Sequence, residues 1–246
     1  MCKIHLIMPM AGGGTRFLKE GFSSPKPLIM LQGKPFFFWA VRSVTKYVDV
    51  QDITFVVLKK HVDEYSIDSH IRKFFPNAFI KVIPKVLNGA VLSCLEGLKN
   101  IDDDMPILFN DCDHAFICQK FYDFCNTANF KSVDGGLLTF TSQSPNFSYV
   151  KFDNQGKVIG TIEKQVVSNE AICGAYYFRN KDIFQMNADT YMKHCNYKEF
   201  FVSGIYNEMA SHGNQIITFP LEEHITFGTP KEYQKALDDN RLVSLR

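Results

Sequence analysis

Residues 8–28, MPMAGGGTRFLKEGFSSPKPL, decide the fold that we predict for this chain. The apolar run at 3–8 has the pattern of a fully buried strand, and it leads into three consecutive glycines at 12–14. Glycines let the backbone adopt positive φ and approach a ligand closely, so that successive N–H groups converge on one concavity. A buried strand that opens into such a loop predicts a phosphate-binding site at the carboxyl end of the strand.

Two cations follow the glycines and fit the same kind of ligand. Arg16 offers a planar, permanently charged donor fork, and Lys26 offers a point charge between two prolines that restrict its backbone. The spacing does not match the dinucleotide fingerprint G-x-G-x-x-G, because position 17 is Phe, and the Walker pattern is absent. The alternative interpretation is a mobile surface turn with two ordinary solvated charges.

Strands and helices alternate beyond this loop. The pattern predicts buried strands at 52–58, 78–83 and 105–109 and helices at 35–47, 62–75, 90–98 and 117–128. Such alternation indicates βαβ crossovers and a mainly parallel sheet, which binds ligands beyond the carboxyl ends of its strands. The fold class is therefore α/β.

The pattern changes near residue 134. Short strands are predicted at 135–141, 149–152, 157–164 and 171–178, followed by helices at 181–193 and 199–212, a strand pair at 214–225 and a helix from Pro230. The short strands indicate a small antiparallel extension that caps the first half. No Pro/Gly/Ser-rich linker divides the chain. We therefore expect one domain over 1–246, with halves at 1–133 and 134–246.

Composition excludes several classes of protein. The 27 Lys+Arg and 26 Asp+Glu give a formal charge of +1, so no global field recruits nucleic acid or an anionic membrane. No apolar run is long enough to span a bilayer or to act as a signal peptide. The seven cysteines contain no C-x-x-C pair, which is typical of free thiols in a reducing compartment. We expect a cytoplasmic protein.

The segment NDCDHAF, residues 110–116, ends the strand predicted at 105–109. Its carboxylates, Asp111 and Asp113, suit a hard cation and lie at the sheet edge predicted to carry the glycine loop. Alternatively, they cap the following helix. A zinc site made from Cys112, His114 and Cys118 is a third interpretation, although its spacing matches no usual structural zinc pattern.

The two opening motifs, IMPMAGGGTRF and SPKPLIMLQGKPFF, resemble the signature of the sugar-1-phosphate nucleotidyltransferase family, especially its short bacterial members found with capsule and surface-polysaccharide genes. The resemblance continues in order through LNGAVLSCLEGL, PILFNDCDHAF, VIGTIEKQVVSNEAICGAYYF, KEFFVSGIYNEMASHG and FGTPKEYQKAL. It implies a Rossmann-like three-layer sandwich of the nucleotide-diphospho-sugar transferase type. It also implies a Mg²⁺-dependent enzyme that joins a nucleoside triphosphate to a phosphorylated small molecule and releases pyrophosphate.

The resemblance assigns the first half of the chain to the nucleotide and the second half to the acceptor. The implied roles are nucleotide binding by Ala11, Gly12, Gly13, Gly14, Gly89 and Asp111; catalysis by Arg16, Lys26 and Lys164; metal binding by Asp113 and Asp111; and acceptor binding by Glu163, Lys164 and Gly174. Simpler roles stay open for several of them: a helix cap at Gly89, a bulge at Gly174 and a solvated pair at 163–164.

One departure from larger relatives concerns the second metal ligand. Those relatives carry an aspartate just before the C-terminal Gly-Thr, where this chain has Thr226 and Phe227. Glu222, Glu223 and a water are the alternatives for this position.

Several functional alternatives also stay open. The short relatives include cytidylyltransferases for small metabolites such as phosphoglutamine, which favours CTP as the nucleotide. One rival is a GT-A type glycosyltransferase that uses Asp111-x-Asp113, and the other is an inactive nucleotide-binding homologue. The oligomeric state, monomer or homodimer, is left open.

Overall fold

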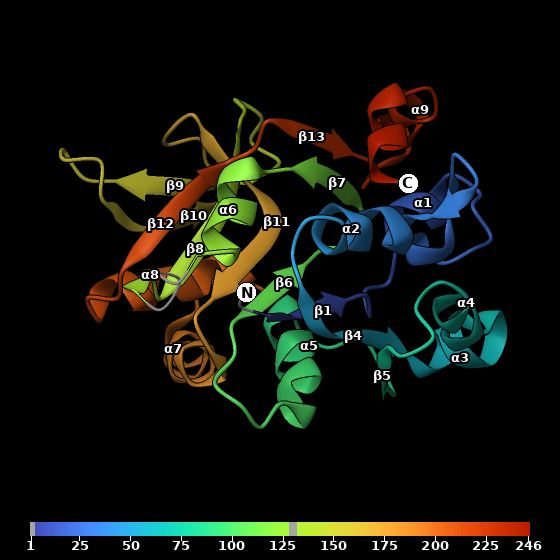
Figure 1. Cartoon of the computed structure of the whole chain (residues 1–246), viewed down its shortest axis with the longest axis horizontal. Helices are drawn as coiled ribbons and strands as arrows, with labels where there is room; N and C mark the ends of the chain where they lie inside the picture. Colours follow the sequence, from blue (N-terminus) through green and yellow to red (C-terminus); the bar gives the residue numbers. More distant parts are fainter. Residues whose placement is uncertain (1–2, 128–131) are drawn as a thin grey trace.

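The computed structural model describes residues 3–127 and 132–246. A nine-stranded mixed sheet runs through its centre (Figure 1). The strands are β1 (Ile4–Pro9), β4 (Val50–Leu58), β5 (Phe79–Ile83), β6 (Ile107–Asn110), β8 (Gly135–Thr141), β9 (Ser148–Phe152), β10 (Val158–Glu163), β11 (Glu170–Phe178) and β12 (Ile216–Pro220). The main path is β10-β9-β11-β6-β1-β4-β5, and β8 and β12 extend it from β11.

The sheet is parallel in its first half and mixed in its second. β1 pairs in parallel with β4 and with β6, and β4 pairs in parallel with β5. β11 then runs antiparallel to β6, β8 and β9. The chain leaves β1 toward β4 and β5 on one side and returns to β6 on the other. This reversal of strand order places a ligand-binding crevice between the carboxyl ends of β1 and β6.

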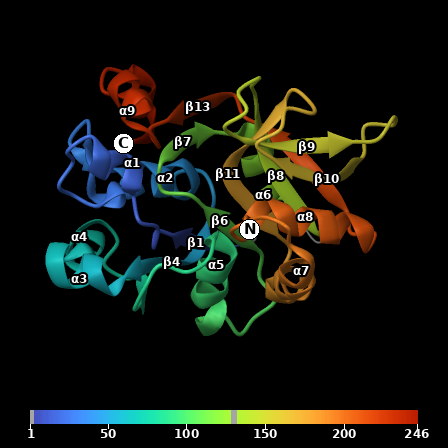
Figure 2. The same ribbon diagram turned by 180° about the vertical axis from the view of Figure 1, so that it is seen from behind.

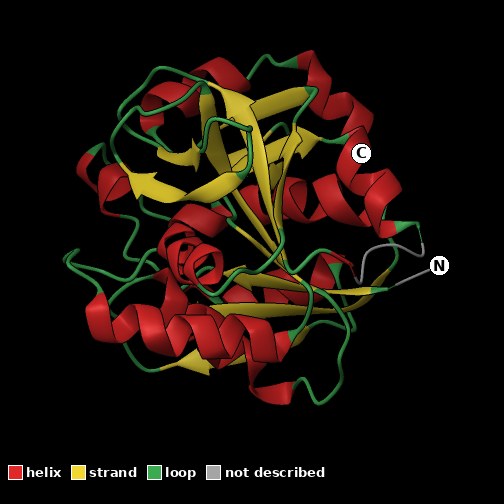
Figure 3. Cartoon of the chain, turned by 90° about the vertical axis from the view of Figure 1, so that its left-hand side faces the viewer, coloured by secondary structure: helices red, strands yellow, loops and turns green. Residues whose placement is uncertain are grey.

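Helices cover both faces of the sheet, as Figures 2 and 3 show from two further directions. One face packs against α2 (Phe36–Thr45), α4 (Ile67–Phe74) and α6 (Gln119–Cys125), and the other against α5 (Ala90–Gly97), α7 (Lys181–His194) and α8 (Val202–Ser211). Side chains of β1 alternate between the two cores: Leu6 and Met8 join the first and Ile7 the second. Each fully buried side chain of this size contributes about 1.5–3 kcal/mol.

A third apolar cluster joins the two ends of the chain beside the glycine loop. It gathers Phe17 of α1 (Thr15–Lys19), Phe36, and Phe227, which follows β13 (Glu223–Thr226). The rings of Phe36 and Phe227 lie 4.7 Å apart. The cluster also includes Ala236 of α9 (Pro230–Ala236). This packing holds the C-terminal segment against the loop that follows β1.

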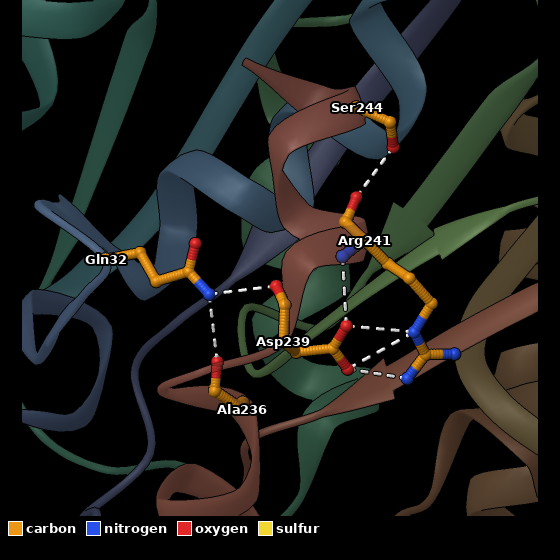
Figure 4. A network of polar contacts seen from close by, with 5 residues as sticks. All are labelled: Gln32, Ala236, Asp239, Arg241 and Ser244. Atoms are coloured by element: carbon orange, nitrogen blue, oxygen red, sulfur yellow. Dashed lines mark hydrogen bonds and ion pairs between the residues drawn. The ribbon is translucent and has the colours of Figure 1, made fainter.

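Polar contacts hold the same segment in place (Figure 4). The Gln32 side-chain amide donates to the carbonyl oxygens of Ala236 and Asp239, at 3.2 and 2.9 Å. The Arg241 guanidinium donates to the Asp239 carboxylate, with a shortest distance of 2.6 Å. Gln32 lies in the turn between β2 (Met30–Leu31) and β3 (Lys34–Pro35), so the network joins an N-terminal turn to the end of the chain.

The predicted α/β class is confirmed, and the structure corrects three local predictions. The helix expected at 62–75 is two helices, α3 (Lys59–Tyr65) and α4, because Ser66 between them adopts a left-handed conformation with φ 49°. The two strands expected to pair at 214–225 are β12 and β13, and each pairs elsewhere: β12 runs parallel to β8, and β13 runs antiparallel to β7 (His114–Ile117).

The third correction concerns β7, which occupies part of the segment where a helix was expected from residue 117. The helix, α6, begins only at Gln119 and ends at Cys125. The end of the expected helix, residue 128, lies outside the described residues.

Short 3-10 helices complete the described fold: η1 (Lys26–Leu28), η2 (Leu98–Asn100) and η4 (Asn240–Leu245). Within residues 3–127 and 132–246, no helix combines the length and apolar character that crossing a lipid bilayer requires.

Candidate active site

The glycine loop and the acidic segment meet at the carboxyl ends of two neighbouring parallel strands. The loop follows Pro9, the last residue of β1, and Asp111 follows Asn110, the last residue of β6. The strands are hydrogen-bonded neighbours at the point where the strand order reverses. The fold therefore places two segments that are distant in sequence at one ligand crevice.

An ion pair connects the two segments. The Lys26 ammonium donates to Oδ2 of Asp113 at 2.7 Å, and the two side chains retain exposed fractions of 29 and 23%. Burial alone would lower the pKa of Lys26, but the charge of Asp113 and its neighbours outweighs burial and raises it. Lys26 therefore stays a cation at every physiological pH.

The pKa values of the two aspartates are shifted in opposite directions. Burial would raise the pKa of Asp113, but the charge and hydrogen bond of Lys26 outweigh it and lower that pKa. Burial and the Asp113 charge raise the pKa of Asp111 well above its usual range. Asp111 thus lacks a compensating cation of its own, and a bound divalent ion would supply one.

Backbone contacts fix both aspartates. The N–H of Asp111 donates to the carbonyl oxygen of Gly174 at 2.9 Å, and the N–H of Phe227 donates to the carbonyl oxygen of Asp113 at 3.0 Å. A Cβ atom at Gly174 would lie 2.7 Å from Oδ2 of Asp111, and one at Gly228 would lie 2.4 Å from Oδ2 of Asp113. A side chain at either position would therefore press against a carboxylate oxygen. The oxygen donor set fits Mg²⁺, which prefers carboxylate and phosphate ligands.

Two cavities meet at the aspartates. The smaller, about 150 Å³, lies against the glycine loop and is lined by Gly12, Gly14, Lys26, Asp111 and Asp113 among others. The larger, about 580 Å³, extends from the same two aspartates toward the second half of the chain. Arg16, an exposed residue of α1, lines the larger one.

Glu163, which the sequence predicts to bind the acceptor, lines the larger cavity. Its carboxylate accepts hydrogen bonds from the hydroxyls of Ser148 and, at 3.4 Å, Ser203. Gly174 lines the same cavity and has φ 101°. Lys164 is exposed and lies outside the lining of both cavities; its ammonium lies 5.2 Å from the centre of the Phe201 ring. A catalytic role for Lys164 stays a prediction.

The remaining predicted nucleotide-binding positions are Gly89, Ala11 and Gly13, and that role stays a prediction for each of them. Gly89 has φ 105°, precedes α5 as its N-cap, and donates its N–H to the carbonyl oxygen of Leu87 at 2.9 Å. That donor is therefore already engaged, which fits the cap interpretation, whereas the next residue, Ala90, lines the larger cavity. Ala11 is buried, and Gly13 is exposed in the loop.

The alternatives for a second metal ligand do not gather around the aspartates. The Glu222 carboxylate accepts the N–H of Gln119 at 2.8 Å, at the start of α6. Neither Glu222 nor Glu223 lines the two cavities, whereas Thr226 lines the larger one.

Sequence reasoning missed several lining residues. Lys231 and Lys235 lie one helical turn apart on α9, and that spacing on a helix opened by Pro230 is a signal present in the sequence. His224 carried no such signal, because it reaches the cavity through the unexpected pairing of β13 with β7.

The strand order and the paired carboxylates at its reversal point define a Rossmann-like α/β protein with its ligand site between β1 and β6. The chain belongs to the Nucleotidyl transferase family, whose model matches residues 6–240. The family inferred from the motifs is thereby confirmed, and with it an enzyme of the nucleotidyltransferase type. No curated protein matches the chain.

Solved structures share the fold. The nucleoside-diphosphate-sugar pyrophosphorylase from Vibrio cholerae RC9 matches with a TM-score of 0.82 and 23% identity, covering 95% of this chain and 100% of that one. The inositol-1-phosphate CTP transferase from T. maritima matches with a TM-score of 0.75 and 12% identity, covering 99 and 94%. A UDP-glucose pyrophosphorylase complexed with UDP-glucose matches at 0.73 and 16%, covering 100% of both chains.

Proposed function

We propose that the protein transfers a nucleotidyl group from a nucleoside triphosphate, CTP in preference, to a small phosphorylated acceptor. A phosphate oxygen of the acceptor attacks the α-phosphorus in line, the bond from that phosphorus to the bridging oxygen breaks, and pyrophosphate leaves with that oxygen. The observation that carries the proposal is the pair of cavities that share Asp111 and Asp113. The reacting phosphates lie where the cavities meet.

The smaller cavity suits the polyphosphate. The glycine loop has no side chains at positions 12–14, and nothing lies within 4 Å of the place where a Cβ at Gly12 would stand. Phosphate oxygens can therefore approach the loop amides directly, while Lys26 supplies positive charge beside them. Arg16, which lines the larger cavity, binds the leaving pyrophosphate.

The acidic pair completes this half of the site. Asp113 and Asp111 would hold Mg²⁺, which would neutralise charge on the triphosphate and on the leaving pyrophosphate. Lys26, whose ammonium donates to Asp113 at 2.7 Å, would supply positive charge beside the α-phosphate. The protein positions groups and balances charge, and no side chain forms a covalent intermediate.

The larger cavity suits the acceptor. Its volume, about 580 Å³, holds a small phosphorylated metabolite. Glu163 accepts hydrogen bonds from hydroxyl or amine groups, and the bare backbone at Gly174 lets the acceptor lie close to Asp111. Lys231 and Lys235 add positive charge for its phosphate. A sugar phosphate and phosphoglutamine both fit this chemistry.

The nucleotide and the cellular role are inferred from likeness. Motifs shared with short cytidylyltransferases support CTP, and one structural neighbour carries CTP transferase in its name. The same motifs support a role in capsule or surface-polysaccharide precursor synthesis. Cys94, Cys112, Cys118, Cys173 and Cys195 are free thiols, which supports a reducing compartment such as the cytoplasm.

A substrate panel tests the proposal. The full chain is incubated with Mg²⁺, each of four nucleoside triphosphates and a set of phosphorylated acceptors, and pyrophosphate release is measured. We expect release with CTP and one acceptor, and a fall of at least about 100-fold for Asp113→Asn. The matched control is Asp63→Asn, an exposed helical aspartate. No pyrophosphate with any pair, together with sugar transfer from a nucleotide sugar, would establish the glycosyltransferase alternative instead.

A further inference from the structure

A second group of ligand atoms lies beside the proposed acceptor site. His114, Cys173 and His224 each offer one nitrogen or sulfur atom, and these atoms lie within 4.8 Å of one another. All three residues line the larger cavity. None of them has a part in the nucleotidyl transfer described above.

The fold brings these residues together in two ways. β7 and β13 pair antiparallel, with His114 opposite Thr226 and His224 opposite Phe116. The two histidines are therefore diagonal neighbours on one face of the ribbon, within reach of each other. Cys173 comes from β11, whose pairing with β8 shifts register between Ile172 and Tyr176. Such irregularities re-aim side chains beside active sites.

The imidazole nitrogens of the group lack partners. His114 is 2% exposed, and neither of its ring nitrogens has a hydrogen-bond partner; Nε2 of His224 is also buried and unpartnered. The two rings lie 5.4 Å apart at 83°. Leaving one buried polar atom unsatisfied costs about 1–3 kcal/mol, so three such atoms on two neighbouring rings indicate a ligand-binding site.

The donor set selects the kind of ion. Two imidazoles and a thiolate favour Zn²⁺ over Mg²⁺, which prefers oxygen. Donor atoms at the corners of a triangle with 4.8 Å sides lie about 2.8 Å from its centre, and zinc bonds of about 2.0–2.3 Å require each to move by under about 1 Å. Small side-chain rotations supply this movement. The Cys173 thiol loses its proton to solvent as the ion binds.

We propose that His114, Cys173 and His224 bind one zinc ion whose fourth position opens into the larger cavity. This site is distinct from the magnesium site at Asp111 and Asp113. Three protein ligands with an open fourth position can take a water or an anionic oxygen of a ligand in that cavity. The two neutral imidazoles and one thiolate leave the complex with a net charge of +1, which favours an anionic ligand.

This ligand set differs from the zinc interpretation of the sequence, which combined His114 with Cys112 and Cys118. The Cys118 thiol donates instead to the carbonyl oxygens of Phe219 and Pro220, at 3.7 and 3.6 Å. Only His114 belongs to both sets.

Zinc binding to the full chain, without a histidine tag, tests the proposal. The protein is stripped with a chelator and titrated with Zn²⁺ by calorimetry, and bound metal is counted by mass spectrometry after gel filtration. We expect one ion per chain, and Co²⁺ in its place should give a thiolate-to-metal charge-transfer band. Cys173→Ser and His224→Asn should each weaken zinc binding at least about 100-fold, and Cys173→Ser should also abolish that band.

Controls make the result specific. Cys118→Ser, a buried cysteine outside the group, and Asp113→Asn should both keep zinc binding and the cobalt band. Circular dichroism confirms that each variant is folded, and if Cys173→Ser fails to fold, the partly exposed His224→Asn decides. Substoichiometric zinc, unchanged binding in His224→Asn, or loss of binding in Asp113→Asn would each overturn the proposal. These measurements do not depend on pyrophosphate release, so zinc binding can be judged even if the proposed transfer activity fails.

Discussion

Replacing Lys26 with methionine removes the ammonium group that joins the glycine loop to the acidic segment, while it keeps most of the aliphatic stem. In the wild-type protein that ammonium lies 2.7 Å from the Asp113 carboxylate, close to the uncompensated Asp111. The variant therefore leaves two neighbouring carboxylates without a cation. It should lose both stability and catalysis, by separate mechanisms.

The structure sets the size of both losses. Breaking a fully buried ion pair costs about 3–5 kcal/mol. The exposed fractions of 29 and 23% reduce this to about 2 kcal/mol, since water screens the remaining charge. In a chain of this length 1 kcal/mol shifts the melting temperature by about 2–4 °C, so we expect a fall of about 4–8 °C. Loss of one charge at the reacting phosphates should lower kcat at least about 100-fold.

The assay combines thermal melting with pyrophosphate release on the same preparations. Lys59→Met is the matched control: its ion pair with Asp63 is of similar length, at 2.9 Å, but the side chains are 63 and 52% exposed. This control should lose under about 0.5 kcal/mol and no activity. If Lys26→Met keeps kcat within about threefold of the wild type, Lys26 does not act on the phosphates. An unchanged melting temperature would refute the stability estimate.

Three further predictions test the surroundings of this ion pair and the C-terminal network. Gly228→Ala places a Cβ 2.4 Å from Oδ2 of Asp113 and must displace the carboxylate by about 1 Å, so pyrophosphate release should fall about 100-fold in a folded protein. In Gly12→Ala the new Cβ has no atom within 4 Å, so the melting temperature should match that of the wild type while KM for the nucleotide rises about tenfold or more. An unchanged KM would show that no nucleotide phosphate binds at this loop. Hydrogen bonding to Arg241 lowers the pKa of Asp239, so this contact stabilises the fold above the ordinary aspartate pKa of about 4 and the stabilisation is lost as pH falls below it. Asp239→Asn should therefore cost under about 1 kcal/mol in urea unfolding at pH 7 and less at pH 3, and an equal cost at both would show that the charge is irrelevant.

Local pattern was enough to predict most elements but not their partners. The strand at 135–141 was predicted with its observed bounds, because a short apolar run between turn residues is a strong signal. The partners of β12 and β13 were missed because the two strands are adjacent in sequence, whereas register with β8 and β7 depends on distant packing. The break at Ser66 was missed because the apolar spacing continues across it.

The residues of the candidate site likewise differ in whether a local sequence motif could predict them. Gly12, Lys26 and Asp113 could be predicted to lie together because each belongs to a short motif downstream of a buried strand, and the fold brings all three to one cavity. His224 and Cys173 carried no signal, since each is an isolated residue whose role depends on a ribbon pairing and an irregular strand.

The β7–β13 ribbon has an implication for how this site can diverge among related chains. It is hydrogen-bonded as its own two-stranded unit rather than as part of the nine-stranded sheet, yet it carries His114, His224 and Thr226 to the larger cavity, which we propose binds the acceptor. Substitutions on its inward face can change which acceptor is recognised without altering the strand registers that hold the glycine loop. We therefore expect the substitutions that change acceptor choice among related chains to concentrate on this ribbon, while the residues proposed to bind the triphosphate stay the same.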